Sequence, residues 1–292
     1  MRPVCRSHTG AIVVFARVGP VSGPMEPTAT AFERASTVEP LGGGRYRGPI
    51  DPGWFGPPGP NGGVVAALIL RAIRAEVGDG ERLPRSLTLH YLRPPRAGEV
   101  EIEVTVERSG RSATSCSARM IEDGELMTAA LCVLSADYEG AAAWAPEPPA
   151  AAPPEQVAPL RIPGTPPPMF ERLDTRGVFG PPPFSGGSEA VTGGWLRTND
   201  GDGLSPELLA LYSDAWWPAP FSRLDRPAMA PTLELTIHFR ARPDPGESWA
   251  LVRISADAVI DGIFDESCDI WSRDGKLLAQ SRQLALLRPW SP

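Results

Sequence analysis

The sequence is poor in cysteine, has no long apolar run and shows no excess of positive charge. Its four cysteines among 292 residues form neither a Cys-x-x-Cys motif nor the dense pattern of a disulfide-stabilised domain. No run approaches the roughly 20 apolar residues of a membrane-spanning helix. A formal net charge of −7 opposes binding to nucleic acid, which needs basic surfaces. We therefore expect a cytoplasmic protein with reduced thiols, no membrane span and no nucleic-acid partner.

Motifs that hold cofactors, metals or activated serines are also missing. The chain has no Gly-x-Gly-x-x-Gly run after a strand, no phosphate-binding loop and no Gly-x-Ser-x-Gly elbow. Its cysteines and three histidines do not cluster at metal-ligand spacing. We therefore expect no cofactor and no metal.

What the sequence does contain is an internal repeat. Leu87–Tyr91 has the sequence Leu-Thr-Leu-His-Tyr, Leu235–Phe239 has Leu-Thr-Ile-His-Phe, and a Gly-Glu pair follows each. These copies lie 148 residues apart, and later turns at Asp123 and Asp274 lie 151 residues apart. An offset near half the chain is too long for a stacked solenoid repeat. It predicts two homologous domains that pack as a pseudo-dimer, with their sheets joined edge to edge or packed face to face.

The first copy has the pattern of one compact unit. A strand near residues 44–50 precedes an apolar helix at residues 64–76, and a helix that is apolar on nearly all sides is a buried one. Alternating apolar and polar residues then indicate half-exposed antiparallel strands separated by hairpin turns. The predicted strands are Leu87–Tyr91, Val100–Val106, Thr114–Ile121 and Leu126–Leu134. This order predicts an α+β unit of the hotdog type, an antiparallel meander wrapped around a central helix.

The second copy repeats this plan. A strand at Gly194–Thr198 precedes a predicted helix at Ser205–Trp217, which an N-cap serine and Pro206 at the first helical position favour. The strands expected after it are Leu235–Phe239, Trp249–Val259, Ile263–Trp271 and Lys276–Leu287. The whole chain is therefore predicted to be a tandem, or double, hotdog.

These patterns divide the chain into four parts. Residues 1–30 precede the repeat and predict a disordered or non-native leader, and residues 31–139 form the N-terminal hotdog domain. Residues 140–168 are rich in alanine and proline, a composition that predicts a semi-rigid linker. Residues 169–292 form the C-terminal hotdog domain.

Several runs lie in a fixed order and spacing along both halves. They include Gly59–Val64, Arg85–Pro94, Tyr212–Ala215, Pro231–Arg240 and Leu277–Leu287. In their order and spacing these runs resemble the type II acyl-CoA thioesterases, particularly actinobacterial thioesterase family proteins, over roughly residues 32–288. Membership implies a double-hotdog fold, homo-oligomers, and hydrolysis of a fatty acyl-CoA or related acyl thioester to free acid and CoA. It also implies a catalytic water held by an Asp, a Thr and a Gln of the second unit.

Carried over to this sequence, these three residues fall on Asp214, Thr232 and Gln283. Thioester hydrolysis needs a positioned water, a carboxylate to take its proton and donors at the developing oxyanion. Asp214 would be the base, and Thr232 and Gln283 would fix the water. In the first copy of the repeat, Pro84 stands at the position equivalent to Thr232, and Cys132 at the position equivalent to Gln283. We therefore expect only one active site per chain.

The run Asn61-Gly62-Gly63 is a second candidate, for substrate binding. It opens the first predicted helix, where backbone N–H groups are natural donors to a carbonyl oxygen or a phosphate. The two glycines leave room for a close approach. The alternative is that the glycines only allow the helix and the sheet to pack closely.

Other readings of the same residues remain open. His90 and His238 occupy equivalent strand positions, and His238-Phe239 is similar to the His-Phe pair of hotdog dehydratases. Duplication in both halves favours instead a structural role, such as hydrogen bonding across the pseudo-dimer seam. The alternatives to a thioesterase are an enoyl-thioester hydratase or dehydratase, and a non-catalytic acyl-CoA-binding module.

Overall fold

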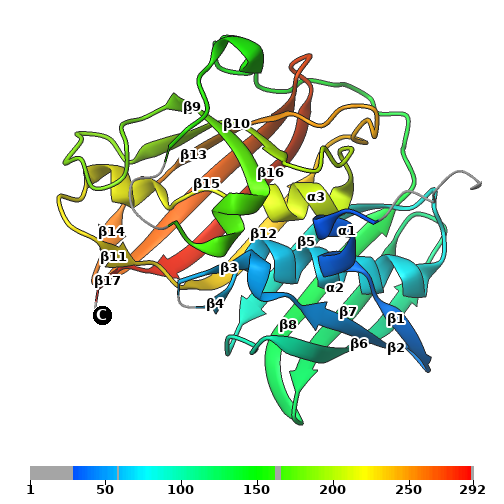
Figure 1. Ribbon diagram of the computed structural model, residues 1–292. Helices are drawn as coiled ribbons and strands as arrows, with labels where there is room; N and C mark the ends of the chain where they lie inside the picture. The colour runs from blue at the N-terminus through cyan, green and yellow to red at the C-terminus, as the bar shows by residue number, and fades with distance from the viewer. Residues whose placement is uncertain (1–28, 58, 162–165, 291–292) are drawn as a thin grey trace, which may run out of the picture.

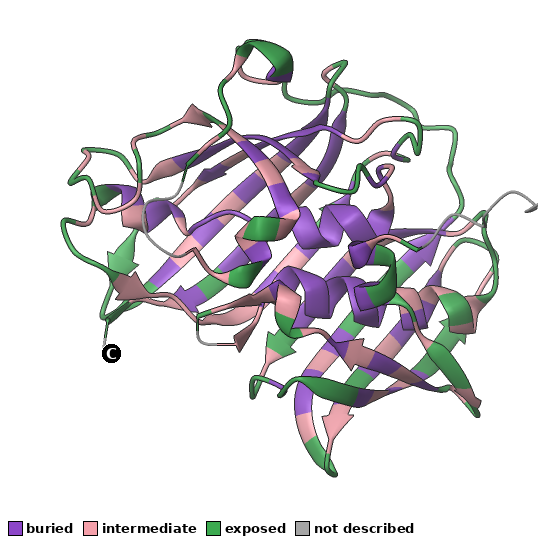
Figure 2. Ribbon diagram, in the orientation of Figure 1, coloured by how far each residue is buried: buried purple, intermediate pink, exposed green. Residues whose placement is uncertain are grey.

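One continuous antiparallel sheet runs through both halves of the molecule (Figure 1). The computed structural model describes residues 29–57, 59–161 and 166–290, so the expected leader lies almost wholly outside the described residues. The sheet has 13 strands in the order β1-β2-β6-β7-β8-β5-β12-β16-β15-β13-β10-β9, with β14 paired to β15. Helices α2 and α3 lie side by side on one face; α3 is buried throughout, and α2 is buried along most of its length except near its C-terminus (Figure 2). The predicted α+β tandem hotdog is confirmed.

The elements of the two halves follow the same order. The N-terminal half contains α1 (Ala31–Ser36), β1 (Glu39–Gly42), β2 (Arg45–Ile50), η1 (Pro52–Trp54), β3 (Phe55–Gly56), β4 (Gly59–Pro60), α2 (Gly62–Val77), β5 (Leu83–Tyr91), β6 (Gly98–Ser109), β7 (Thr114–Glu122) and β8 (Glu125–Ser135). Two 3₁₀ turns follow, η2 (Pro154–Gln156) and η3 (Pro168–Arg172). The C-terminal half contains β9 (Leu173–Phe179), β10 (Val191–Thr198), α3 (Pro206–Tyr212), η4 (Ala219–Arg223), β11 (Ala228–Met229), β12 (Thr232–Phe239), β13 (Ala250–Ser255), β14 (Val259–Ile260), β15 (Ile263–Ser272), β16 (Leu277–Leu286) and β17 (Arg288–Pro289).

Within each half, the meander differs from the predicted one. Strands β6, β7 and β8 pair in succession, but β5 pairs with β8 instead of β6. The second half does the same, with β12 beside β16. The connection from β5 to β6 spans residues 92–97 and contains two prolines, so it is not a tight hairpin turn.

The two halves meet at β5 and β12, so the sheets join edge to edge and the face-to-face alternative is wrong. Thr88 faces Thr236 in this seam, and their hydroxyl oxygens are 3.0 Å apart. These threonines are 148 residues apart, the spacing of the repeat. The pseudo-twofold axis therefore passes between them, and the strand order on one side of the seam repeats on the other.

The seam histidines do not behave as the sequence suggested. His90 and His238 lie in β5 and β12, but both imidazoles are exposed on the sheet face away from the helices. In the described part of the chain, no side-chain hydrogen bond involves either of them, whereas Thr88 and Thr236 do bond across the seam. Hydrogen bonding by these histidines across the seam was therefore a wrong expectation.

The central helices differ in length. Helix α2 has 16 residues, begins at the N-cap Asn61 and ends at Gly78, whose φ of 64° is the left-handed conformation that glycine adopts without strain. Helix α3 has 7 residues and ends at Tyr212, so the predicted helix Ser205–Trp217 is too long. Pro218 excludes a helix that reaches Trp217, because it lacks an N–H and disfavours helical geometry at the residue before it, but it does not account for an end as early as Tyr212.

The predicted strand Trp249–Val259 is likewise two strands, β13 and β14. Ala256, just after β13, donates its N–H to the carbonyl of Ala190 in the loop before β10. That bond extends the pairing on the β10 side, while the ladder with β15 stops after Ser255 and resumes only at Val259.

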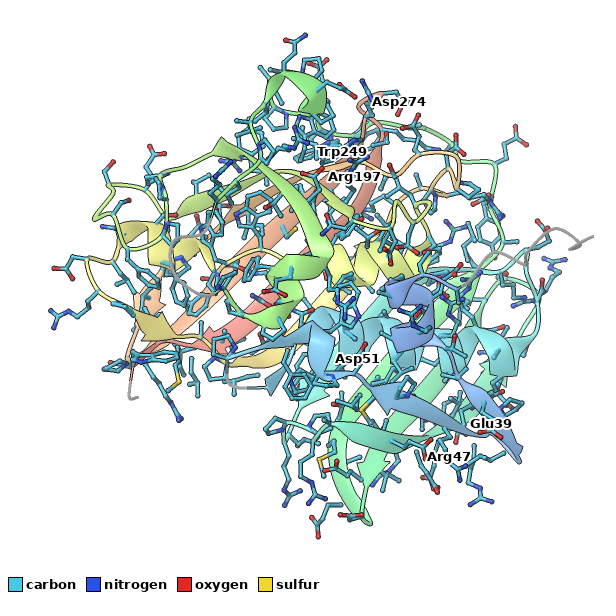
Figure 3. All side chains as sticks on the ribbon, viewed as in Figure 1. Glu39, Arg47, Asp51, Arg197, Trp249 and Asp274 are labelled. Carbon is cyan, nitrogen blue, oxygen red and sulfur yellow. The ribbon has the colours of Figure 1, made fainter. Side chains whose placement is uncertain are left out.

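Part of the Ala/Pro-rich segment packs onto the outer face of the second sheet. Ala151 and Val157 contact a cluster of buried side chains on that face, and Trp195 donates its indole N–H to the Ala152 carbonyl at 2.7 Å. The guanidinium of Arg197 lies 4.5 Å from the ring centre of Trp249, and the two are labelled at the top of Figure 3. The cluster consists of Trp195, Trp249, Leu251, Trp271 and Leu277.

Candidate functional site

Asp214 lies just beyond α3, at the N-terminus of α2. In a continued helix its carbonyl would accept the N–H of residue 218, but that residue is proline. The side-chain amide of Asn61 takes that place, with Nδ2 donating to the Asp214 carbonyl at 2.6 Å. The same Nδ2 donates to the carboxylate Oδ2 at 3.0 Å, and the N–H of Gly63 donates to Oδ2 at 3.2 Å. The helix break and the helix start together fix this carboxylate.

Asn61 has two roles in this arrangement. Its Oδ1 accepts the N–H of Val64 at 3.1 Å, which is the N-cap bond of α2. Its Nδ2 is thereby turned toward Asp214. One side chain therefore begins the helix and orients the carboxylate.

The two glycines allow a close approach. A Cβ on Gly63 would lie 2.5 Å from the carbonyl oxygen of Leu211, and one on Gly62 would lie 2.9 Å from the Asp214 carboxylate. The Tyr91 hydroxyl donates to the Gly62 carbonyl at 2.8 Å and covers the site from β5. Close packing, one of the two roles considered for these glycines, is therefore present.

The pKa of the Asp214 carboxyl is raised to about 6. Burial is the main cause, and the donors at Gly63, Gly62 and Asn61 oppose it by stabilising the charged form. The N-terminal end of the α2 dipole also favours a negative charge here. The group is therefore mostly ionised at neutral pH yet close enough to its pKa to exchange a proton.

Thr232 and Gln283 meet at the first residue of β12. The Thr232 hydroxyl donates to Gln283 Oε1 at 3.4 Å, and Gln283 Nε2 donates to Glu266 Oε1 at 2.9 Å. Glu266 lies directly opposite Gln283 across the β15–β16 ladder, and its Oε2 accepts the N–H of Ala219 at 2.6 Å. The three side chains form a hydrogen-bonded row that leads from the core to the start of β12.

The sequence analysis missed Glu266. Its side chain is 5% exposed and its pKa is raised to about 8, first by burial and also by the negative charge of Asp214. The signal was present, because Glu266 occupies an inward position of β15 in alternation with Phe264, Cys268 and Ile270. A carboxyl on the apolar face of a predicted strand is rare enough to mark a site.

The structure thus brings the predicted residues together in two groups. Asn61 and Gly63 bind Asp214, and Thr232 binds Gln283. Glu266 connects the groups, since it is bonded to Gln283 and lies within the electrostatic range of Asp214.

The equivalent positions of the first half hold Pro84 in β5 and Cys132 in β8, and both are buried. Neither supplies a polar hydrogen-bonding group comparable to those of Thr232 and Gln283. Across residues 29–290, leaving aside 58 and 162–165, no group of three or more His, Cys, Asp or Glu side chains could hold a metal ion. No helix of that described part is long and apolar enough to cross a membrane.

Comparisons with known proteins agree with this fold. Profiles of the acyl-CoA thioesterase N-terminal and C-terminal domains match residues 50–135 and 145–287. An uncharacterized protein of Mycobacterium tuberculosis strain H37Rv is 26% identical over 270 residues, which cover 83% of this chain and 90% of that protein. A hot dog fold protein of Alicyclobacillus acidocaldarius superposes with a TM-score of 0.81 at 28% identity, covering 90% of this chain and 100% of the other.

An acyl-CoA thioesterase II of Mycobacterium marinum shares the fold, with a TM-score of 0.73 at 23% identity over 89% of this chain and 99% of the other. The two profiles match successive parts of the chain, and each contains one of the central helices described above. The chain therefore belongs to the acyl-CoA thioesterase family and is a thioester hydrolase.

Proposed function

We propose that the protein hydrolyses a fatty acyl-CoA, or a related acyl thioester, to the free acid and CoA, with Asp214 as the general base. The observation that carries this proposal is the partly buried carboxylate of Asp214, which Asn61 and Gly63 hold in place. No cation in the described part of the chain forms an ion pair with it, so the carboxylate is free to accept a proton.

In the proposed reaction, Asp214 takes a proton from a water molecule whose oxygen attacks the thioester carbon. The tetrahedral intermediate collapses, the carbon–sulfur bond breaks and the CoA thiolate leaves, to be protonated by Asp214 or by solvent. Thr232 and Gln283 supply the hydroxyl and amide groups that orient the water. Asn61 and Gly63 act through Asp214, whose carboxylate already uses their donors. The substrate-binding role of Asn61, Gly62 and Gly63 stays a prediction.

The two alternatives find less support. A hydratase of the hotdog type needs a histidine at the reacting atoms, but His90 and His238 are exposed on the opposite face of the sheet. A pure binding module has no use for a partly buried carboxylate with a pKa near neutrality. We retain both as outcomes of the test.

The test follows CoA release from saturated acyl-CoA substrates of several chain lengths with a thiol reagent. We expect turnover by the wild type and a loss of about 100-fold or more in kcat for Asp214→Asn, with KM changed little. Asp174→Asn is the matched control, because Asp174 is a partly buried aspartate of β9 that pairs with Arg176 and Arg197. It should keep wild-type turnover.

Each other result decides against the proposal. Equal kcat for the wild type and Asp214→Asn would remove Asp214 as the base. Hydration of an enoyl-CoA without CoA release would support the hydratase, and tight binding with neither reaction would support the binding module.

The remaining expectations from the sequence are proposals of the same kind. They are the domain boundaries, a role in lipid metabolism, a cytoplasmic location and a homo-oligomeric state. Glu101 and Glu103 do not guard a sheet edge, because β6 is paired with β2 on one side and β7 on the other; the sheet ends at β1 and β9. Light scattering of the full chain would measure the oligomeric state directly, and a concentration-independent monomer would contradict it.

A further inference from the structure

We propose that Glu266 is a positioning residue that decides which end of the Gln283 carboxamide faces Thr232. Through that choice it decides whether Thr232 presents a hydrogen or a lone pair to the reacting atoms. The kinetic consequences of this inference rest on the proposed function, but the orientation of the Gln283 carboxamide can be tested without it.

The geometry fixes the hydrogen-bond partner of each carboxyl oxygen of Glu266. Glu266 and Gln283 are each 5% exposed and face one another across the β15–β16 ladder. Oε2 of Glu266 is occupied by the N–H of Ala219 in η4, at 2.6 Å. Oε1 is left to bond Gln283, at 2.9 Å. Any proton bound by this carboxyl group therefore lies on Oε1 and between the two side chains.

The protonation state of Glu266 fixes the direction of the hydrogen bonds that join Glu266, Gln283 and Thr232. An ionised carboxylate only accepts hydrogen bonds, so Gln283 turns Nε2 to Glu266 and Oε1 to Thr232. The Thr232 hydroxyl hydrogen is then committed to Gln283 at 3.4 Å, and only its lone pairs face outward. A protonated carboxyl donates to Gln283 Oε1 instead, the carboxamide turns over, and Nε2 donates to Thr232. The Thr232 hydroxyl hydrogen is then free for the substrate or the water.

The surrounding charges favour the neutral form. The negative charge of Asp214, just beyond α3, acts on Glu266 and raises its pKa, and no cation of the described residues pairs with Glu266. Cys268 shares the inward face of β15, and burial keeps its thiol neutral by raising its pKa. Asp265 and Asp269 of the same strand alternate with these inward residues and bond Arg282 and Gln280.

The structure shows the arrangement of the ionised form, with Gln283 Nε2 donating to Glu266. Burial and the Asp214 charge raise the pKa of Glu266 to about 8, so at pH 7 we expect the protonated carboxyl and the turned carboxamide instead. The neutral form is also the one suited to hydrolysis. The intermediate gains negative charge beside Asp214, and a second anion there would oppose it. The released Thr232 hydroxyl adds a donor at the same place.

The first test is the pH profile of kcat/KM. We expect the wild type to lose activity in alkali with an apparent pKa near 8, a decline of about 30-fold between pH 7 and pH 9.5 for a single ionisation. Glu266→Gln mimics the neutral acid, because its amide donates to Gln283 Oε1 and its oxygen accepts from Ala219. This variant should keep most of the wild-type activity at pH 7 and lose the alkaline decline.

Two further variants separate positioning from simple support of the fold. Glu266→Leu removes the bond to Gln283 and should lower kcat by about 10-fold or more at every pH, with little change in KM. Asp265→Asn changes the preceding carboxyl, which points to the other face of β15 and pairs with Arg282. It should leave the alkaline decline intact. An alkaline decline that persists in Glu266→Gln overturns the proposal.

The second test needs no activity. The side-chain amide signals of Gln283 in a ¹⁵N-labelled wild-type protein, assigned by their loss in Gln283→Leu, should shift with a midpoint near pH 8. The same signals should not titrate in Glu266→Gln. Absence of CoA release by the wild type would reject the proposed function and leave this titration as the test of Glu266. A pH-independent Gln283 amide in the wild type would reject the positioning role itself.

Discussion

The proposed function needs the charged form of the Asp214 carboxyl group, whereas the stability of the fold favours the neutral form. Its pKa rises from 3.8 to about 6 because burial penalises the charge. The folded state therefore holds its proton more tightly than the unfolded chain does. This stabilising contribution is complete below about pH 4 and is lost as the pH rises through about 6. At neutral pH the fold is destabilised by the charge that the proposed reaction needs.

Asp214→Asn should consequently raise stability while it removes activity. At pH 7.5 we expect the free energy of unfolding to increase by about 1–3 kcal/mol, because a shift of two pKa units corresponds to about 3 kcal/mol. At pH 4.5 the two proteins should differ much less. Denaturant unfolding at both pH values measures this. A variant that is less stable than the wild type at pH 7.5 would show that the hydrogen bonds of the carboxylate outweigh the cost of burying it.

The two helix N-caps provide a matched pair of mutations. Asn61→Ala and Ser205→Ala each remove a side-chain bond to the first turn, at Val64 and Leu208 respectively, and each should cost about 1 kcal/mol. Only Asn61 also donates to Asp214. Asn61→Ala should therefore raise the apparent pKa of the acid limb of kcat/KM, whereas Ser205→Ala should leave it unchanged. Identical acid limbs in the two variants would mean that Asn61 does not tune the base.

Sequence reasoning found part of this site. The family resemblance predicted Asp214, Thr232 and Gln283, and the structure bonds Thr232 to Gln283. The occupation of the Asn61 and Gly63 donors by Asp214 could not be predicted, because it depends on how two helices from different halves meet. Glu266 could have been found from its inward position in β15, but a single buried carboxyl acquires meaning only beside Gln283.

At the scale of elements, the lengths of the central helices determine where the site forms. Helix α2 continues to Gly78, while α3 stops at Tyr212 and leaves Asp214 at the N-terminus of α2. The sequence predicted both helices from their apolar residues. Because Trp216 and Trp217 are also apolar, the apolar pattern continues past the end of α3 and does not mark it. Pro218 was the available signal that the helix cannot reach Trp217.

Close contact of the two helices depends on Gly63. A Cβ there would lie 2.5 Å from the Leu211 carbonyl oxygen, which is backbone and cannot rotate away. Gly63→Ala should therefore lower stability by about 1–3 kcal/mol despite the better helix propensity of alanine. Gly80→Ala is the control, since nothing lies within 4 Å of a Cβ at that position. Thermal unfolding of the two variants measures the difference, and equal melting temperatures would mean that α2 and α3 separate at little cost.

At the scale of the molecule, the two copies of the repeat share one sheet and one buried core. The buried core contains side chains of both central helices and of strands on both sides of the seam, from Ile102 in β6 to Ile270 in β15. The repeat predicted two equivalent units but not which edges meet, because each unit has two edges with similar alternation. The contact of Thr88 with Thr236 shows that β5 and β12 are those edges.

Because the sheet and the core are continuous, we expect the full chain to unfold in one cooperative transition. Calorimetry should give a single peak whose calorimetric and van't Hoff enthalpies agree. Two resolved transitions would show that the halves are energetically separate despite their common sheet. The control is Thr88→Val, which removes the hydroxyl contact at the seam and should shift the peak without splitting it.

The seam also predicts how an isolated half behaves. A fragment of residues 29–139 would expose the β5 edge together with the face of α2 that packs on α3. Unpaired strand edges and large apolar faces promote association. Since the axis between Thr88 and Thr236 is nearly twofold, β5 of a second fragment has the direction and spacing to replace β12. Light scattering after size-exclusion chromatography should therefore find the folded fragment as a dimer, with twice the fragment mass and a concentration-dependent monomer fraction. A folded fragment that stays monomeric at high concentration would mean that the first half needs no partner at this edge.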